Sequence, residues 1–210
     1  MISKASFKIV LLLATLFVLG FSGTARAQSI IKQPGNHPDY SVEIEPHLDF
    51  QWGGGPWSDY DSFGPGARFN IPIVRNGFIP KLNNSVAIGF GFDVTFGSYR
   101  WCGGRAYYVA GYDCSVTEFW LPAVLQWNFW LTKVVSVFGE PGFAIVHTRW
   151  SNPYWYCNGP QNAPCADYRD SHTGVEPVFS AGGRFMFSDT FGATVRIGYP
   201  MISAGLNILL

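Results

Sequence analysis

Charged residues recur at every second position near the start of the chain. Glu43, Glu45, His47 and Asp49 follow one another at intervals of two residues. Residues two apart in a β-strand share one face, so this spacing collects three carboxylates and an imidazole on a single face. Buried carboxylates are costly unless cations pair with them. The pattern therefore predicts basic side chains opposite this segment.

Later segments supply further acids and the arginines. We expect Arg68, Arg184 and Arg196 to point inward and to pair with acids of the same face. The predicted network comprises Glu43, Glu45, Asp49, Arg68, Asp93, Glu118, Glu140, Glu176, Arg184 and Arg196. Two interpretations stay open: a hydrogen-bonded plug that fills the interior, or a constricted pore whose excess of acids favours cations.

Hydroxyl and imidazole groups also occur close together. Asp170, Ser171 and His172 are consecutive, and His147 lies four residues before Ser151. A serine activated by histidine could perform acyl hydrolysis, but neither spacing matches a catalytic arrangement. The sequence therefore predicts no enzyme, and it indicates no cofactor and no metal site.

Four cysteines fall into two pairs in regions rich in loop residues, Cys102 with Cys114 and Cys157 with Cys165. Four cysteines allow three pairings, and pairing within each loop is the most economical. A site with four cysteine ligands would be expected to show tight C-x-x-C spacing, which this chain lacks. We expect two disulfides, since the chain carries an export signal and oxidising compartments favour them.

The first 27 residues have the organisation of a secretory signal peptide. Lys4 and Lys8 precede an apolar run over 9–21, and an A-x-A pattern ends at Ala27, so cleavage is expected between Ala27 and Gln28. Loss of three basic residues leaves 11 against 14 acidic ones, a net charge of −3. This balance excludes a basic nucleic-acid binder. Residues 28–38 would form a short N-terminal segment.

The remaining chain alternates apolar and polar residues with period 2, which is typical of β-strands. Aromatic residues make up 17% of the sequence and charged residues only 13%, so ample apolar surface excludes disorder. Turn residues divide the pattern into strands with long connections at 97–115 and 148–173. The eight segments cover 40–52, 63–73, 86–96, 116–129, 135–146, 175–187, 191–199 and 202–210.

Eight such segments predict an all-β fold, an eight-stranded antiparallel up-and-down barrel. The polar face carries small residues and almost no lysine, which suits a crowded interior. The apolar face is too bulky for so narrow an interior and would face lipid, making the barrel transmembrane. Aromatic residues toward the strand ends are expected at the membrane interfaces: Tyr40, Trp52, Trp127, Trp130 and Tyr199.

In this pattern the chain resembles the small eight-stranded outer-membrane barrels of Gram-negative bacteria, of the OmpA transmembrane domain, OmpX and OmpW type. The resemblance covers residues 39–210, and the terminal segment Ile202 to Leu210 resembles the assembly signal of these proteins, although it ends in Leu210. It implies a monomer in the outer membrane, with a structural role or a role in passive transport of small solutes or ions. It also implies that residues 28–38 are periplasmic and that the disulfide-tied long loops are extracellular. Its implied partners are outer-membrane lipids, lipopolysaccharide and the barrel-assembly machinery, with no nucleic acid.

Two alternatives stay open. Some barrels of this size hydrolyse acyl groups of lipid A, which the residues near His147 or Ser171 would have to perform. A secreted, lipocalin-like soluble barrel would instead place its apolar face inside and bind an apolar ligand there.

Peptide mapping without reduction should recover Cys102 linked to Cys114 and Cys157 linked to Cys165, because closure of short loops stabilises the fold by about 3 kcal/mol each. Sequencing of the mature N-terminus should begin at Gln28. A peptide joining the two loops, or free thiols, would contradict the pairing.

Overall fold

The computed structural model describes residues 28–51, 60–99, 114–156 and 166–210, and the predicted signal peptide lies outside them. Among the described residues, none forms a helix of the length and apolar character that a membrane span requires. The strands are β1 (Glu43–Gln51), β2 (Ser62–Val74), β3 (Asn84–Tyr99), β4 (Cys114–Trp130), β5 (Val135–Tyr156), β6 (Ala166–Met186), β7 (Phe191–Tyr199) and β8 (Ile202–Leu209).

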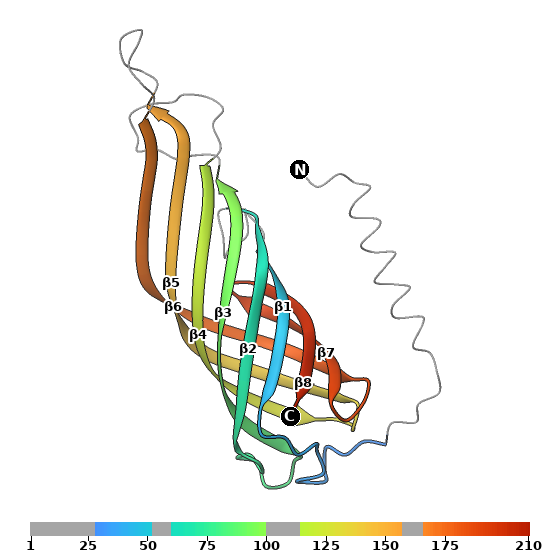
Figure 1. Ribbon diagram of the computed structural model, residues 1–210. Coiled ribbons are helices and arrows are strands. Elements are labelled where there is room, and N and C mark those ends of the chain that lie inside the picture. The colour runs from blue at the N-terminus through green and yellow to red at the C-terminus, as the bar shows by residue number, and fades with distance from the viewer. Residues whose placement is uncertain (1–27, 52–59, 100–113, 157–165) are drawn as a thin grey trace.

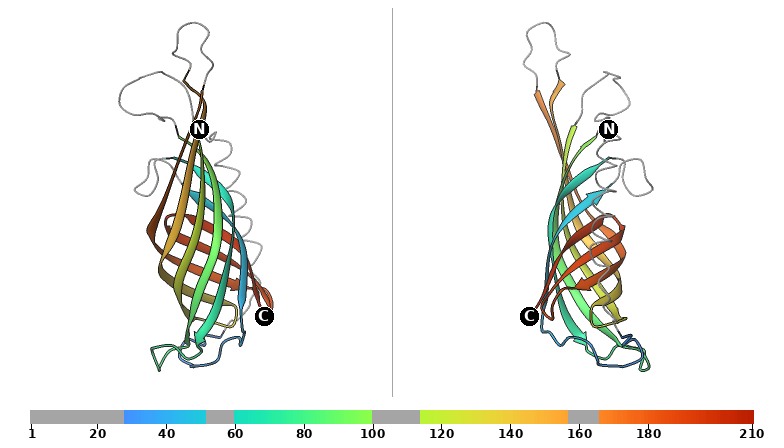
Figure 2. Two further views of the ribbon diagram at one scale, coloured as in Figure 1. Left: turned by 60° about the vertical axis from the view of Figure 1, so that its left-hand side comes forward. Right: turned by 90° about the vertical axis from the view of Figure 1, so that its right-hand side faces the viewer.

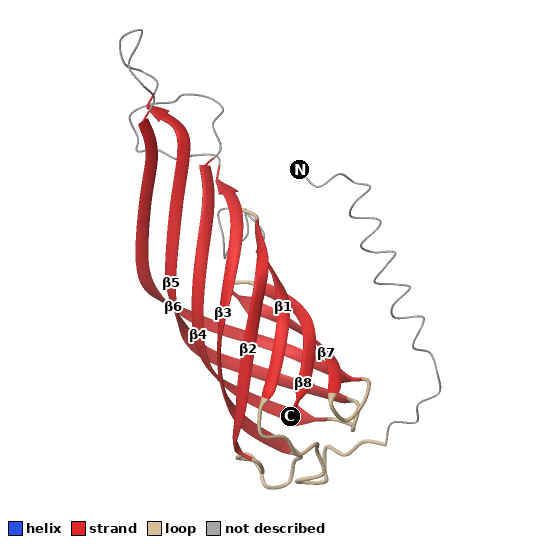
Figure 3. Ribbon diagram, in the orientation of Figure 1, coloured by secondary structure: helices blue, strands red, loops and turns tan. Residues whose placement is uncertain are grey.

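Each strand pairs antiparallel with the next in sequence, and β1 pairs with β8, so the sheet closes on itself (Figure 1). Strands account for most of the described chain (Figure 3). The predicted eight-stranded antiparallel barrel is confirmed. Closure gives the end strands partners for their backbone groups, since β1 and β8 would otherwise be sheet edges.

The predicted facing of the strands is also confirmed. In β1 the side chains of Glu43 and Glu45 are fully buried, whereas Leu48, which lies in the opposite phase, is 52% exposed. The exposed apolar side chains of the other strands alternate with buried polar ones in the same way. Polar residues therefore fill the inside of this barrel, and large apolar residues cover its outside.

The two ends of the barrel differ. The base is the end at which the connections 75–83, 131–134 and 187–190 lie together with residues 28–42 and the C-terminus (Figure 1). The rim is the opposite end, where β1 leads toward β2, β3 toward β4 and β5 toward β6. The connections 131–134 and 187–190 are short and lie at the base, as the sequence predicts, whereas the two-residue turn 200–201 joins β7 to β8 at the opposite end.

The predicted long loop over 148–173 is wrong in extent. β5 continues to Tyr156 and β6 begins at Ala166, and the two pair as far as Tyr156 with Ala166. Similarly, Cys114 begins β4 and pairs with Tyr99 of β3. β5 and β6 extend well beyond the short β7 and β8 (Figure 2). Backbone pairing holds these extensions, whose sequences lack the alternation that one buried face imposes.

The base is closed by an apolar cluster that alternation alone does not predict. Trp130 and Tyr40, expected at membrane interfaces, are buried together with Ile30, Met186 and Leu209. Ile30 donates a backbone hydrogen bond to the Leu131 carbonyl at 2.9 Å. The N-terminal segment therefore packs against the base, because the side chain of Ile30 belongs to the same buried cluster as Trp130. Trp52 lies outside the described residues.

Substitution of Trp130 by alanine should destabilise the folded barrel by about 3–5 kcal/mol, because it leaves a cavity in a buried cluster. Urea unfolding of the refolded protein in detergent measures this change. Phe191→Ala, at a side chain 55% exposed, is the control and should cost clearly less. Equal losses would contradict the assignment of Trp130 to a packed cluster.

Candidate functional site: the charged interior

Arg184 of β6 and Glu43 of β1 form the first salt bridge above the base. Arg184 Nη2 lies 2.5 Å from Glu43 Oε1 and donates to Oε2 at 2.6 Å, and both side chains are fully buried. Arg184 Nη1 also lies within 3.4 Å of Asn128 Oδ1 and 3.3 Å of Ser136 Oγ. The guanidinium carbon of Arg184 lies 5.6 Å from the ring centre of Trp130, so the charge rests directly on the apolar base cluster.

Arg196 of β7 pairs with two carboxylates one layer further toward the rim. It donates to Glu45 through Nη1 and Nη2 at 2.5 and 2.7 Å, and to Glu140 Oε2 through Nε at 2.7 Å. Gln126 and Ser180 donate to the same Glu140 carboxylate at 2.7 and 3.0 Å. Charge-assisted bonds of this kind are about twice as strong as neutral ones, so this layer ties several strands together.

Arg68 of β2 and His47 of β1 occupy the next layer. Arg68 lies 3.7 Å from Asp93 and 3.8 Å from Glu140. His47 Nε2 lies 2.9 Å from Asp93 Oδ1 and 3.5 Å from Asp49 Oδ2. We call these nine residues the salt-bridge cluster: Glu43, Glu45, His47, Asp49, Arg68, Asp93, Glu140, Arg184 and Arg196.

Glu118 and Glu176 lie apart from this cluster, although both were expected as arginine partners. Glu118 accepts bonds from uncharged donors, among them the Trp120 indole at 3.1 Å and the Tyr60 hydroxyl. The strand register sets Glu118 beside threonines of β3 and β5. Glu176 accepts from the Tyr199 hydroxyl at 3.4 Å. The arginines therefore pair with the acids nearer the base.

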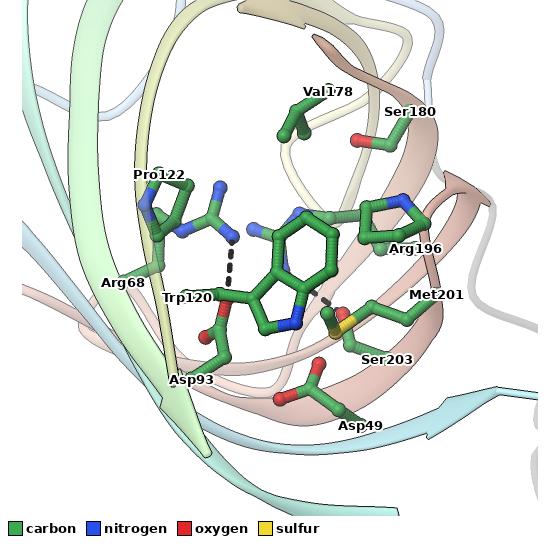
Figure 4. Close-up of a pocket in the computed structure, with 11 residues that line it drawn as sticks. Asp49, Arg68, Asp93, Trp120, Pro122, Val178, Ser180, Arg196, Met201 and Ser203 are labelled. Atoms are coloured by element: carbon green, nitrogen blue, oxygen red, sulfur yellow. Dashed lines mark hydrogen bonds and ion pairs between the residues drawn. The ribbon is translucent and has the colours of Figure 1, made fainter. Parts of the chain in front are cut away.

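A second apolar cluster lies inside the barrel on the rim side of the charges. Trp120 and Val124 break the alternation of β4 and pack with Ala144, Val146 and Val178. Beside them a cavity is lined by Asp49, Arg68, Asp93, Trp120, Arg196 and Met201, among others (Figure 4). The interior of the described barrel is thus filled in layers, apolar at the base, charged in the middle and apolar again above the cavity.

The residues considered for hydrolysis have other partners. His147 Nδ1 bonds to Thr173 Oγ1 at 2.8 Å, while Ser151 Oγ bonds to Ser115 Oγ at 2.7 Å. Asp170 accepts from the backbone of Ser171 at 2.8 Å. His147 and Ser151 are therefore hydrogen-bonded to other hydroxyl groups and not to each other. Cys102, Cys157 and Cys165 lie outside the described residues, so the disulfides stay a prediction.

Several residues that complete the cluster are not among those predicted from charge. Gln126, Asn128 and Asn70 are fully buried and bond to its charged members or to one another. Their signal in the sequence is the alternation itself, which assigns every second residue of a segment to the interior whether charged or not. A search for ion pairs misses these amides because they carry no charge.

No family model matches the sequence, and no curated protein matches it. Similar solved structures include two of Ail, the attachment invasion locus protein of Yersinia pestis. One is in complex with the heparin analogue sucrose octasulfate, with 14% identity and a TM-score of 0.44 over 80% of this chain and 97% of Ail. The other has 12% identity and a TM-score of 0.41, over 80% and 97% of the two chains.

The N-terminal β-barrel domain of Pseudomonas aeruginosa OprF is similar at 12% identity, with a TM-score of 0.37 over 81% of this chain and 98% of that domain. The resemblance to small outer-membrane barrels is one of fold. The architecture of this chain follows from its own strand pairing, and such low identities transfer no activity to it.

Replacement of Arg196 by alanine should destabilise the barrel by about 3–5 kcal/mol, since it leaves Glu45 and Glu140 buried without their cation. The double variant R196A/E140Q should recover part of this loss. Arg75→Ala is the matched control, because the Arg75–Asp39 pair is also 2.7 Å long but about two-thirds exposed and should contribute under about 1 kcal/mol. Urea unfolding of all three variants measures the differences, and equal effects of R196A and R75A would contradict a buried network.

Proposed function

We propose that this chain is an integral outer-membrane β-barrel protein with a structural role, whose interior is closed by the salt-bridge cluster. The observation that carries the proposal is the facing of the side chains, which is opposite to that of an ordinary soluble barrel. Charges are inside and large apolar side chains are outside.

The outer face supports a lipid environment. Phe90, Phe92 and Phe96 on β3 are each about half exposed, as are Phe119 and Leu121 on β4. The same holds for large apolar residues on most other strands. Soluble proteins rarely expose apolar patches larger than a few hundred Å², whereas a membrane barrel requires such a band. A lipocalin-like ligand binder would need the opposite facing.

The inner face supports a plug more than an open pore. Arg184 and Arg196 reach across the interior to β1, and both are nearly or completely buried. The Trp130 cluster closes the base below them. Solute passage through this conformation would require the salt bridges to separate.

A gated cation path is the second candidate. The cavity beside Asp49 and Asp93 and the excess of acids over arginines favour it, because an acidic constriction attracts cations. In both cases the proposed partners are outer-membrane lipids and lipopolysaccharide, with the assembly machinery reading the segment from Ile202. We propose a monomer that is not an enzyme.

Membrane insertion is tested by fractionation of expressing cells after a carbonate wash. The mature chain should stay in the membrane pellet and should leave it only with detergent. Recovery of folded protein in the soluble fraction would contradict the proposal and favour a secreted soluble barrel.

Planar-bilayer recordings distinguish the plug from the gated path. The wild-type barrel should show little conductance, and Arg184→Ala or Arg196→Ala should raise it only if the salt bridges form the barrier. Folding of each variant is checked by its heat-modified gel mobility, and Arg75→Ala again serves as control. Large steady wild-type conductance would contradict a closed interior.

A further inference from the structure

His47, Asp49 and Asp93 converge on one point inside the barrel. One ligand atom of each residue lies within 4.8 Å of the other two, and all three residues are buried. The strand register explains the convergence, because Gly66 of β2 lies between His47 of β1 and Asp93 of β3. Because Gly66 has no side chain, the side chains of His47 and Asp93 occupy the space beside it.

Gly66 marks the centre of this space. A Cβ atom built on Gly66 would lie less than 3.0 Å from each of three atoms, Asp93 Oδ1, His47 Nε2 and Asp49 Oδ2. Ligand atoms of a tetrahedral zinc ion are separated by about 3.4 Å, given bonds of about 2.0–2.1 Å. The observed separations of 2.9 and 3.5 Å from His47 Nε2 to the two carboxylates bracket that value.

The hydrogen bonds of His47 set its orientation. Its Nδ1 lies 3.1 Å from the Glu45 carbonyl oxygen, and a carbonyl only accepts, so Nδ1 donates. Nε2 lies 2.9 Å from Asp93 Oδ1, and since a carboxylate accepts, Nε2–H donates to it when no ion is bound; a metal ion would take the place of that proton. Histidine ligands of metals commonly donate their other ring N–H to a carbonyl in this way.

Asp49 and Asp93 each have a carboxylate oxygen available to bind a cation. Asp49 Oδ2 is buried without a hydrogen-bond partner in the described structure, and Asp49 is only 1% exposed. Arg68 lies near Asp93 Oδ2, at 3.7 Å, which leaves Asp93 Oδ1 for the shared space. An unpartnered buried carboxylate oxygen is costly, and a metal ion would satisfy it.

The net charge of the salt-bridge cluster also favours a bound cation. Its five carboxylates face three guanidinium groups, so two negative charges remain when His47 is neutral. One divalent cation supplies that charge. Asp49 and Asp93, though not His47, line the cavity shown in Figure 4, which leaves room for a water ligand beside the two carboxylates.

We propose that His47, Asp49 and Asp93 bind one divalent transition-metal ion, of the class of Zn²⁺, inside the barrel. Imidazole together with carboxylate favours this class over Mg²⁺ and Ca²⁺, which prefer oxygen ligands alone. The site goes beyond the proposed membrane function and does not depend on it, because the folded barrel in detergent would bind the ion equally well.

The test is Zn²⁺ binding to the refolded full-length mature barrel in detergent, after treatment with a chelator and with its cysteines left oxidised. Calorimetry and metal analysis after dialysis should give one Zn²⁺ per chain, and Zn²⁺ but not Mg²⁺ should raise the melting temperature. Co²⁺ should give a spectrum without thiolate-to-metal charge transfer, which separates this site from cysteine binding.

Two variants locate the ion. H47Q should weaken Zn²⁺ binding by more than the roughly 10–100-fold that loss of an outer-shell partner produces. G66A keeps every ligand but fills the shared space, so it should also abolish binding. Folding of both is checked by heat-modified gel mobility.

E118Q is the matched control, since Glu118 is a buried interior carboxylate outside the cluster, and it should bind Zn²⁺ as the wild type does. Absence of stoichiometric binding to the wild type overturns the proposal, and this measurement needs no variant to fold. Undiminished binding by folded H47Q also overturns it. Either result would leave membrane insertion unaffected, because carbonate extraction tests that separately.

Discussion

The interior of this barrel depends on one constraint: carboxylates removed from water must find cations. Glu43 and Glu45 on β1 are fully buried, and their partners Arg184 and Arg196 lie 141 and 151 positions later in the chain. Breaking either pair leaves a buried charge without its partner. Strand closure and salt-bridge formation therefore support each other, since the arginines reach β1 only when the barrel is closed.

The apolar clusters at the two ends of the charged layer strengthen this arrangement. Trp130 and Tyr40 close the base, and Trp120 with its neighbours packs above the cavity. Both clusters exclude water, and a lower local dielectric strengthens the salt bridges between them. The guanidinium of Arg184 also lies over the Trp130 and Phe138 rings. Apolar and charged layers thus act together rather than as separate cores.

The proposed metal site would complete the same charge balance. The arginines satisfy the acids near the base, and the remaining negative charge lies around His47, Asp49 and Asp93. Gly66 has a direct part here, because a larger residue would fill the point at which the three ligand atoms meet. A bound divalent ion would link β1 to β3 across β2 and would stiffen the layer beside the cavity.

The sequence by itself determined the class of fold and the facing of the strands. One buried face imposes alternation, and the odd spacing between Glu45 and Leu48 is enough to assign these two residues to opposite faces. Alternation also identified the acids and arginines of the interior. Alternation did not predict the extensions of β5 and β6. No buried face imposes an alternating pattern there, and backbone pairing alone holds the two strands together.

Tertiary structure alone decided which charges meet. Register sets Glu118 beside threonines while Arg196 lies between Glu45 and Glu140, and alternation carries no information about register. Likewise, only the folded chain brings Ile30 into the same buried cluster as Trp130, a residue 100 positions later. The meeting of His47 with Asp93 required three adjacent strands with glycine in the middle, a juxtaposition of residues 46 positions apart that only the closed sheet creates.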